Sequence, residues 1–112
     1  MQRGEIWLVD LAPTIGPGTR KTRPAVILSS DLVGVLPVKI IVPFTAWKDR
    51  YAQAPWMVRI EPDEKNGLGK PSAADALQIR SVSQQRLAQK LGLLSPLQVA
   101  QIVQAVMTTL QR

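Results

Sequence analysis

Short apolar runs separated by turns dominate the first part of this sequence. Segments 5–10, 25–30, 38–44 and 56–61 are rich in β-branched and aromatic residues, and prolines and glycines interrupt the chain between them. Residues of the first kind favour strands, whereas proline removes a hydrogen-bond donor from a sheet. Strands this short and closely spaced predict a small, strongly bent antiparallel sheet or partial barrel. Over 72–79 the sequence indicates either a weaker strand or a helix turn, because alanines lower the β propensity.

A single amphipathic helix is expected at the end of the chain. Ser95 is a suitable N-cap, Pro96 fits the first helical position, and Gln98 completes a capping-box pattern. Apolar residues then recur at helical spacing, at Val99, Ile102, Val103, Val106 and Leu110. Such a face packs against a sheet, so the sequence predicts a mostly β, α+β fold in one domain that spans residues 1–112.

The charge balance favours a polyanionic partner. The chain has 14 Lys and Arg against 8 Asp and Glu, a formal net charge of +6. Such a surface attracts nucleic acid, although ordinary solubility charge produces the same excess. No apolar run approaches the roughly 20 residues that span a bilayer, and the N-terminus lacks a signal peptide's apolar stretch. We expect a soluble, cytoplasmic protein without membrane contact, with Lys39 among its exposed charges.

Histidine and cysteine are both absent. This removes the commonest general base, the commonest metal ligand and all thiol chemistry. The aspartates are scattered without metal-ligand spacing, so neither two-metal nuclease chemistry nor a glycosidase carboxylate pair is expected. Any catalysis must use carboxylates, hydroxyls, Lys, Arg, Tyr or backbone groups, and we expect no metal and no cofactor.

The loop before the second expected strand is the first candidate for anion binding. Arg20, Lys21 and Arg23 follow a Gly-Pro-Gly tip and lead into that strand. The Arg23 guanidinium is a planar fork of donors that matches two phosphate oxygens. A solvated basic loop would have the same composition. The absence of a Gly-Lys-Ser/Thr ending argues against a Walker A nucleotide site.

The end of the third expected strand is the second candidate. Thr45 supplies a hydroxyl there, and Trp47 and Lys48 follow it closely. Aromatic rings stack on unpaired bases while cations follow the phosphate backbone, so this stretch fits the rim of a single-strand binding site. Two alternatives are open: Trp47 covers loop backbone instead, and Trp56 sits in the core because it begins an alternating strand.

Four stretches, taken in order, carry the signatures of a known family. They are residues 3–11 (RGEIWLVDL), 21–29 (KTRPAVILS), 41–45 (IVPFT) and 78–82 (QIRSV). Together with the C-terminal helix, these stretches resemble the MazF/PemK-type toxins of type II toxin–antitoxin systems. The similarity runs nearly end to end.

The resemblance implies an SH3-like, CcdB-like partial barrel of antiparallel strands with a C-terminal helix, assembled as a homodimer. It also implies an endoribonuclease that cleaves single-stranded RNA with sequence preference and without metal, and a cognate antitoxin protein that neutralises it. By the family's pattern, Arg23 and Thr45 are catalytic and Gln78 contacts RNA. The neighbouring RNA-binding candidates are Thr19, Arg20, Lys21, Trp47 and Lys48.

Physical chemistry agrees with this assignment. RNA carries its own nucleophile, the 2′-hydroxyl, so the enzyme must only align it with the adjacent phosphate and stabilise the charge that develops. Arg23 is expected to stabilise the phosphate and to take part in a proton relay, and Thr45 to donate to a phosphoryl oxygen. The expected products carry a 2′,3′-cyclic phosphate and a 5′-hydroxyl.

Two departures from the family pattern bear on base recognition. Pro17-Gly18-Thr19 follows Gly16 where relatives often carry an acidic residue, and Leu77 stands where they place Asp or Glu before the glutamine. Two other functions stay open: a same-fold toxin that binds a protein, as gyrase poisons do, and a non-catalytic RNA-binding module. Retention of both Arg23 and Thr45 favours the endoribonuclease.

Overall fold

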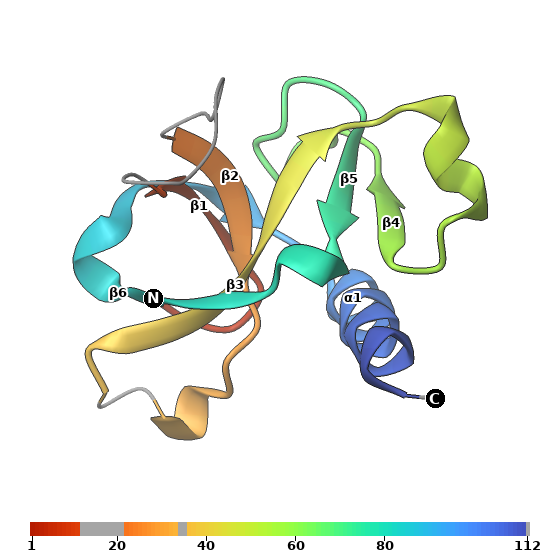
Figure 1. Ribbon diagram of the computed structural model, residues 1–112. Helices are drawn as coiled ribbons and strands as arrows, with labels where there is room; N and C mark the ends of the chain where they lie inside the picture. The colour runs from red at the N-terminus through yellow and green to blue at the C-terminus, as the bar shows by residue number, and fades with distance from the viewer. Residues whose placement is uncertain (12–21, 34–35, 112) are drawn as a thin grey trace.

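Seven strands and one α-helix make up the computed structural model, which describes residues 1–11, 22–33 and 36–111 (Figure 1). The elements are β1 (Glu5–Asp10), β2 (Thr22–Ile27), β3 (Val38–Ala46), β4 (Met57–Ile60), β5 (Ser72–Asp75), β6 (Arg80–Ser83), β7 (Leu87–Leu93) and α1 (Pro96–Leu110). Short 3₁₀ turns join several of them, among them η2 (Asp49–Gln53), η3 (Ala76–Gln78) and η4 (Gln84–Arg86).

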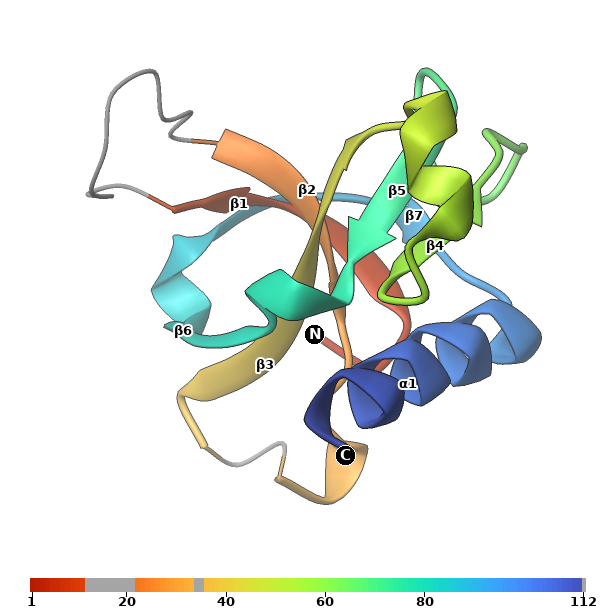
Figure 2. The ribbon, with the colours of Figure 1, turned by 45° about the vertical axis from the view of Figure 1, so that its right-hand side comes forward.

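The strands form an antiparallel sheet in the order β4-β5-β3-β2-β1-β7. β6 pairs with the first half of β3, whereas β5 pairs with its last residues. β3 therefore joins two curved parts of this sheet, one with β1, β2, β6 and β7 and one with β4 and β5, as Figures 1 and 2 show. The expected α+β, mostly β partial barrel with a terminal helix is confirmed.

Two buried apolar clusters occupy opposite faces of the paired strands β2 and β3. On β2, Val26 contributes to the larger cluster, while Ala25 and Ile27 contribute to the smaller one, as the alternation of side chains along a strand requires. The larger cluster includes residues of the helix and comprises Ile6, Val26, Leu28, Val42, Phe44, Ile60, Leu68, Ala74, Leu94, Val99 and Ile102. The smaller comprises Val9, Leu11, Ala25, Ile27, Ile41, Val82 and Leu87, with Trp7 against it.

The helix begins as its sequence predicts. The Ser95 Oγ accepts the Gln98 N–H at 3.2 Å, and the Gln98 Oε1 accepts the Ser95 N–H at 3.1 Å, which completes the capping box. α1 packs against β4 and η3 and buries Val99, Ile102 and Ala105. Neither α1 nor any other helix in the described part of the chain has the length and hydropathy needed to cross a membrane.

Lys39 contradicts the sequence expectation. It is only 4% exposed, whereas its neighbours Val38 and Ile40 are 41% and 43% exposed. The reason is register: Lys39 lies opposite Val82 of β6 and shares the face of β3 that carries Ile41 of the smaller cluster. The aliphatic stem of a lysine tolerates such coverage.

The structure refines or corrects three further expectations. The stretch 72–79, expected to be either a strand or a helix turn, contains one of each: the strand ends at Asp75, and the Asp75 side chain accepts the Leu77 N–H and caps the 3₁₀ turn η3. Trp56 is half-buried and belongs to neither apolar cluster. β6 and β7 were not expected, since neither carries a run of β-branched or aromatic residues.

Glu5 is a buried carboxylate that links β1 to β7. One oxygen accepts the Trp7 indole N–H at 2.9 Å, and the other lies 3.3 Å from the Lys90 Nζ. Burial opposes the charge of Glu5, but hydrogen bonds from Trp7, the Gln2 backbone and Lys90 outweigh it. Together these hydrogen bonds and the neighbouring N-terminal charge lower the Glu5 pKa from 4.5 to about 2.

The free energy of unfolding should therefore depend on the ionisation of Glu5 at acidic pH. Because its folded-state pKa lies below the unfolded value, ionised Glu5 stabilises the fold above about pH 4.5 and loses this effect as the pH falls towards 2. Glu5→Gln should lower the free energy of unfolding at pH 7 by roughly 1–3 kcal/mol and flatten its decline below pH 5. Urea unfolding at several pH values measures both. An equally steep decline in the two proteins would contradict this account.

Candidate active site

A pocket opens where β2 and β3 part. The two strands stay paired up to Ala25 and Pro43, after which β3 pairs with β5 instead. Arg23 lies on β2 two residues before Ala25, and Thr45 lies on β3 two residues after Pro43. Because strand side chains alternate between faces, Arg23 shares the face of Ala25, and Thr45 shares that of Pro43. The register thus brings a guanidinium and a hydroxyl to the same opening.

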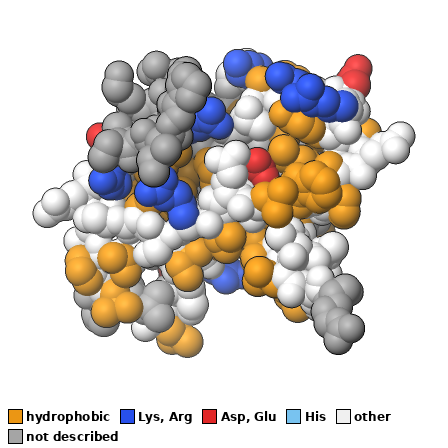
Figure 3. All heavy atoms as spheres, viewed as in Figure 1, with side chains coloured by type: hydrophobic (Ala, Val, Ile, Leu, Met, Phe, Trp, Pro, Cys, Tyr) orange, Lys and Arg blue, Asp and Glu red, His pale blue; other side chains and the backbone are white. Residues whose placement is uncertain are grey.

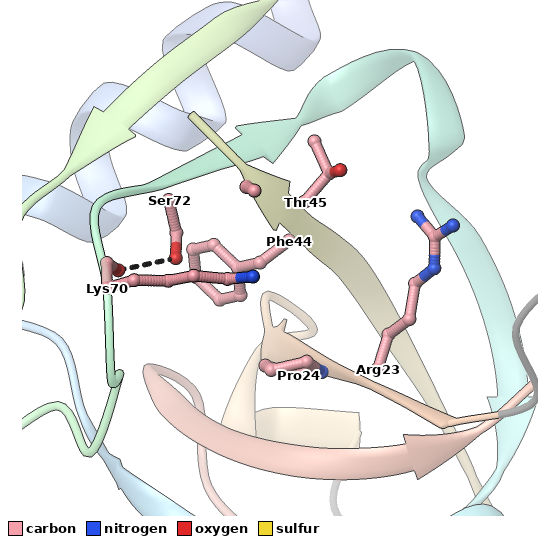
Figure 4. A pocket seen from close by; sticks show the side chains of 7 residues that line it. Arg23, Pro24, Phe44, Thr45, Lys70 and Ser72 are labelled. Carbon is pink, nitrogen blue, oxygen red and sulfur yellow. Dashed lines mark hydrogen bonds between the residues drawn. The ribbon is translucent and has the colours of Figure 1, made fainter. Parts of the chain in front are cut away.

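The pocket has a volume of about 270 Å³. It is lined by Arg23, Pro24, Phe44, Thr45, Ala46, Lys70 and Ser72. In Figure 4 the Arg23 side chain stands on one side, Lys70 reaches in from the other, and Thr45 lies above them. None of the described lining residues is acidic, so two cations and two hydroxyls face a cavity that suits an anion.

The wall formed by residues 70–72 is fixed to the end of β3. The Ser72 Oγ donates to the Lys70 carbonyl at 2.9 Å. The Trp47 backbone N–H donates to the Pro71 carbonyl at 3.0 Å. The floor is anchored in the core, because Phe44 is 2% exposed and belongs to the larger apolar cluster. These contacts set the position of the Lys70 backbone relative to Thr45.

Gln78 lies outside this lining, on the exposed side of η3. Its Nε2 donates to the Asp75 Oδ2 at 2.8 Å, while the Asp75 Oδ1 accepts the Leu77 N–H at 3.1 Å. Asp75 is itself buried. The acidic group that orients Gln78 is therefore Asp75, three residues before it in the chain.

The Trp47 ring is not an open stacking surface. The Arg59 guanidinium lies 4.9 Å from its centroid, and Tyr51 packs edge-on with centroids 5.9 Å apart. Its indole N–H is buried and has no hydrogen-bond partner among the residues that the structure describes. A base that stacked on the same face would have to displace Arg59, which is also paired with Glu61.

The structure separates the candidate residues into groups. Arg23 and Thr45 line one pocket, whereas the half-buried Trp47 and the exposed Lys48 lie beyond its lining. Residues 19–21 (Thr19, Arg20 and Lys21) lie outside the described part of the chain. Among the described residues, no three His, Cys, Asp or Glu side chains gather where they could hold a metal ion.

Sequence reasoning missed Lys70 and Ser72. Lys70 follows a polar turn region and precedes an alanine-rich strand, so neither composition nor spacing distinguished it from a solvated lysine. The only local pattern that could have marked these two residues is the Lys-Pro-Ser sequence where β5 begins. That tripeptide is not typical of any particular chemistry. Their place in the pocket follows from the pairing of β5 with the end of β3.

Comparison with known proteins agrees with this geometry. A family model described as a PemK-like, MazF-like toxin of type II toxin-antitoxin system matches residues 2–110. "Endoribonuclease MazF9" of Mycobacterium tuberculosis is 34% identical, over 95% of this chain and 92% of the relative. "Endoribonuclease MazF" of Staphylococcus saprophyticus is 32% identical, over 95% and 88%.

Solved structures share the fold. MazF from Deinococcus radiodurans superposes with a TM-score of 0.78 at 22% identity, covering 98% of this chain and 96% of that one. An endoribonuclease from a mycobacterial species, solved with its cognate antitoxin, gives a TM-score of 0.75 at 21% identity, covering 98% and 94%. With a family match over almost the whole length, the chain belongs to the PemK-like, MazF-like toxins of type II toxin–antitoxin systems.

Proposed function

We propose that this protein is a toxin endoribonuclease that cleaves single-stranded RNA, such as mRNA, with sequence preference. The observation that carries the proposal is the placement of the Arg23 and Thr45 side chains in one pocket with no acidic residue among its described lining. The names of the relatives support this function, and they do not support the two alternatives, a protein-binding toxin and a non-catalytic RNA-binding module.

The chemistry needs no nucleophile from the protein. The 2′-oxygen of the RNA attacks the adjacent phosphorus, the bond to the 5′-oxygen breaks, and a 2′,3′-cyclic phosphate and a 5′-hydroxyl result. The Arg23 fork donates to the phosphoryl oxygens, and the Thr45 hydroxyl donates to one of them. Fixed donors of this kind stabilise the charge that develops in the transition state. None of these roles requires a metal or a cofactor.

A cognate antitoxin is the expected protein partner. Structures of this fold have been solved with antitoxins, from a mycobacterial species and from D. radiodurans. The pocket residues Arg23 and Lys70 are cationic, and Figure 3 shows Lys and Arg side chains over the upper part of the face, where β3 ends and β5 begins. We propose that an antitoxin segment covers this groove in the cytoplasm and excludes RNA from it.

A second copy of the chain is the other expected partner. Leu36, Val38 and Ile40 lead into and begin β3, and they are 48%, 41% and 43% exposed. Apolar side chains gather at the lower left of Figure 3, where β3 begins in Figure 1. Contiguous exposed apolar side chains of this kind mark interaction surfaces. We propose that this part of β3 contributes to a homodimer interface.

Cleavage of a long single-stranded RNA in EDTA tests the catalytic assignment. We expect the purified protein to produce discrete fragments with 5′-hydroxyl ends. Arg23→Ala should lower the rate by about 10²–10³-fold, because a fixed donor to the developing charge is lost. Arg23→Lys keeps the positive charge but loses the planar pair of donors. Its cleavage rate should therefore lie between those of the wild type and Arg23→Ala.

Thr45 gives an independent test in the same assay. Thr45→Ala should slow cleavage, whereas Thr45→Ser should restore it, because serine keeps the hydroxyl. The control is Thr108→Ala on the exposed side of α1, which should cleave like the wild type. Fragments that persist unchanged in Arg23→Ala and Thr45→Ala would refute the assignment.

Sedimentation equilibrium tests the homodimer. The wild type should sediment at about twice the chain mass of 12.3 kDa. Ile40→Lys should sediment as a monomer, because it places a charge in the proposed apolar interface. Leu97→Lys, at a leucine of α1 that is 69% exposed, is the matched control and should stay dimeric. A monomeric wild type, or dimeric Ile40→Lys, would contradict the proposed interface.

A further inference from the structure

Lys70 is the second cation of the pocket, and the reaction described above does not use it. It comes from the segment before β5, whereas Arg23 comes from β2. In Figure 4 the two side chains enter the pocket from opposite sides, and the Lys70 ammonium points towards its middle. Among the described residues, no carboxylate forms an ion pair with Lys70.

The fold fixes the Lys70 backbone beside the pocket. The Trp47 N–H donates to the Pro71 carbonyl, and Ser72 pairs with Ala46, which attaches this segment to the end of β3. Within the segment, the Ser72 Oγ donates to the Lys70 carbonyl. Lys70 itself is exposed, so its ammonium can exchange protons with water. A cation on a fixed backbone, opposite the guanidinium and free of an acidic partner, is placed to act on the same phosphate.

The reaction needs a proton donor for its leaving group, and the phosphate contacts assigned to Arg23 and Thr45 do not supply one. In an in-line displacement the attacking 2′-oxygen and the leaving 5′-oxygen lie on opposite sides of phosphorus. The departing 5′-oxygen would become an alkoxide, which is a poor leaving group unless it receives a proton. An arginine is effectively never deprotonated in proteins. A lysine ammonium, by contrast, is one of the groups that serve as general acids in enzymes.

We propose that Lys70 is a further catalytic residue, the general acid that protonates the leaving 5′-oxygen. The 2′-oxygen bonds to phosphorus and gives its proton to water. The electron pair of the breaking P–O5′ bond goes to the 5′-oxygen, which takes a proton from the Lys70 Nζ. The neutral amine then regains a proton from the hydronium ion. This assignment rests on the proposed endoribonuclease function.

A substrate with a better leaving group tests the role directly. A site that the wild type cuts in a long RNA is first mapped, and two short oligonucleotides spanning it are made. One carries the natural 5′-oxygen at the cut site and the other a bridging 5′-sulfur, because a thiolate leaves without a proton. The wild type, Lys70→Ala, Lys70→Arg, Arg23→Ala and Lys65→Ala are assayed on both oligonucleotides in EDTA.

The expected pattern is specific to a proton donor. On the natural substrate Lys70→Ala should lower kcat by about 10²-fold or more with little change in KM. On the sulfur substrate it should cleave close to the wild-type rate. Lys70→Arg keeps the positive charge but is a poor acid, so it should show the same defect and the same rescue. Arg23→Ala should be slow on both substrates, and Lys65→Ala, at an exposed lysine in the turn after β4, should be unaffected.

Three results would overturn the role of Lys70. They are wild-type rates for Lys70→Ala on the natural substrate, equal losses on the two substrates, and full activity of Lys70→Arg. If these occur while Arg23→Ala is inactive, the proposed function stands and only the Lys70 assignment fails. If the wild type cuts no RNA in EDTA, the proposed function fails and this assignment fails with it.

Discussion

The candidate site depends on the change of pairing partner along β3. This strand pairs with β2 only as far as Pro43 and then with β5 through Phe44 to Ala46. Pro24 on β2 and Pro43 on β3 lie at the point of separation, and neither has an amide hydrogen to give to a ladder. If β2 and β3 stayed paired beyond this point, each strand would cover the edge of the other. Because they diverge, a pocket opens between them.

The same divergence explains why residues distant in sequence act together. Arg23 comes from the start of β2, Thr45 from the end of β3, and Lys70 from the segment that leads into β5. The backbones of Arg23 and Thr45 are held by strand pairing, and the segment that carries Lys70 is held by the hydrogen bond from Trp47 to Pro71. A site built in this way needs little rearrangement when an anion enters, which is the condition under which fixed donors stabilise a transition state well.

Local sequence signals predicted the first strand and the C-terminal helix better than the elements between them. The bounds of β1 and the capping box of α1 follow from strand propensity and from the Ser-Pro-x-Gln pattern. β7 escaped prediction because its sequence, LAQKLGL, is stabilised by pairing with β1 and not by its own propensity. The burial of Lys39 likewise follows from its register with β6, which no local pattern reveals.

The candidate site was predictable only in part. Composition left Arg23 indistinguishable from a solvated loop residue, and the family resemblance singled out both Arg23 and Thr45. The register of β2 and β3 supplies the physical reason for that pairing. Lys70 and the Asp75–Gln78 hydrogen bond depend on the path of the chain around β5, so they required the structure.

The most direct test of the account is a crystal structure with an oligonucleotide that the protein cleaves, made uncleavable by removal of the 2′-hydroxyl at the cut site. The account predicts that the phosphate at the cut site lies in the pocket between β2 and β3. It should then be within hydrogen-bond distance of both the Arg23 guanidinium and the Thr45 hydroxyl. A bound oligonucleotide whose cut-site phosphate lies on another face, with these two side chains in contact with neither of its free oxygens, would contradict it.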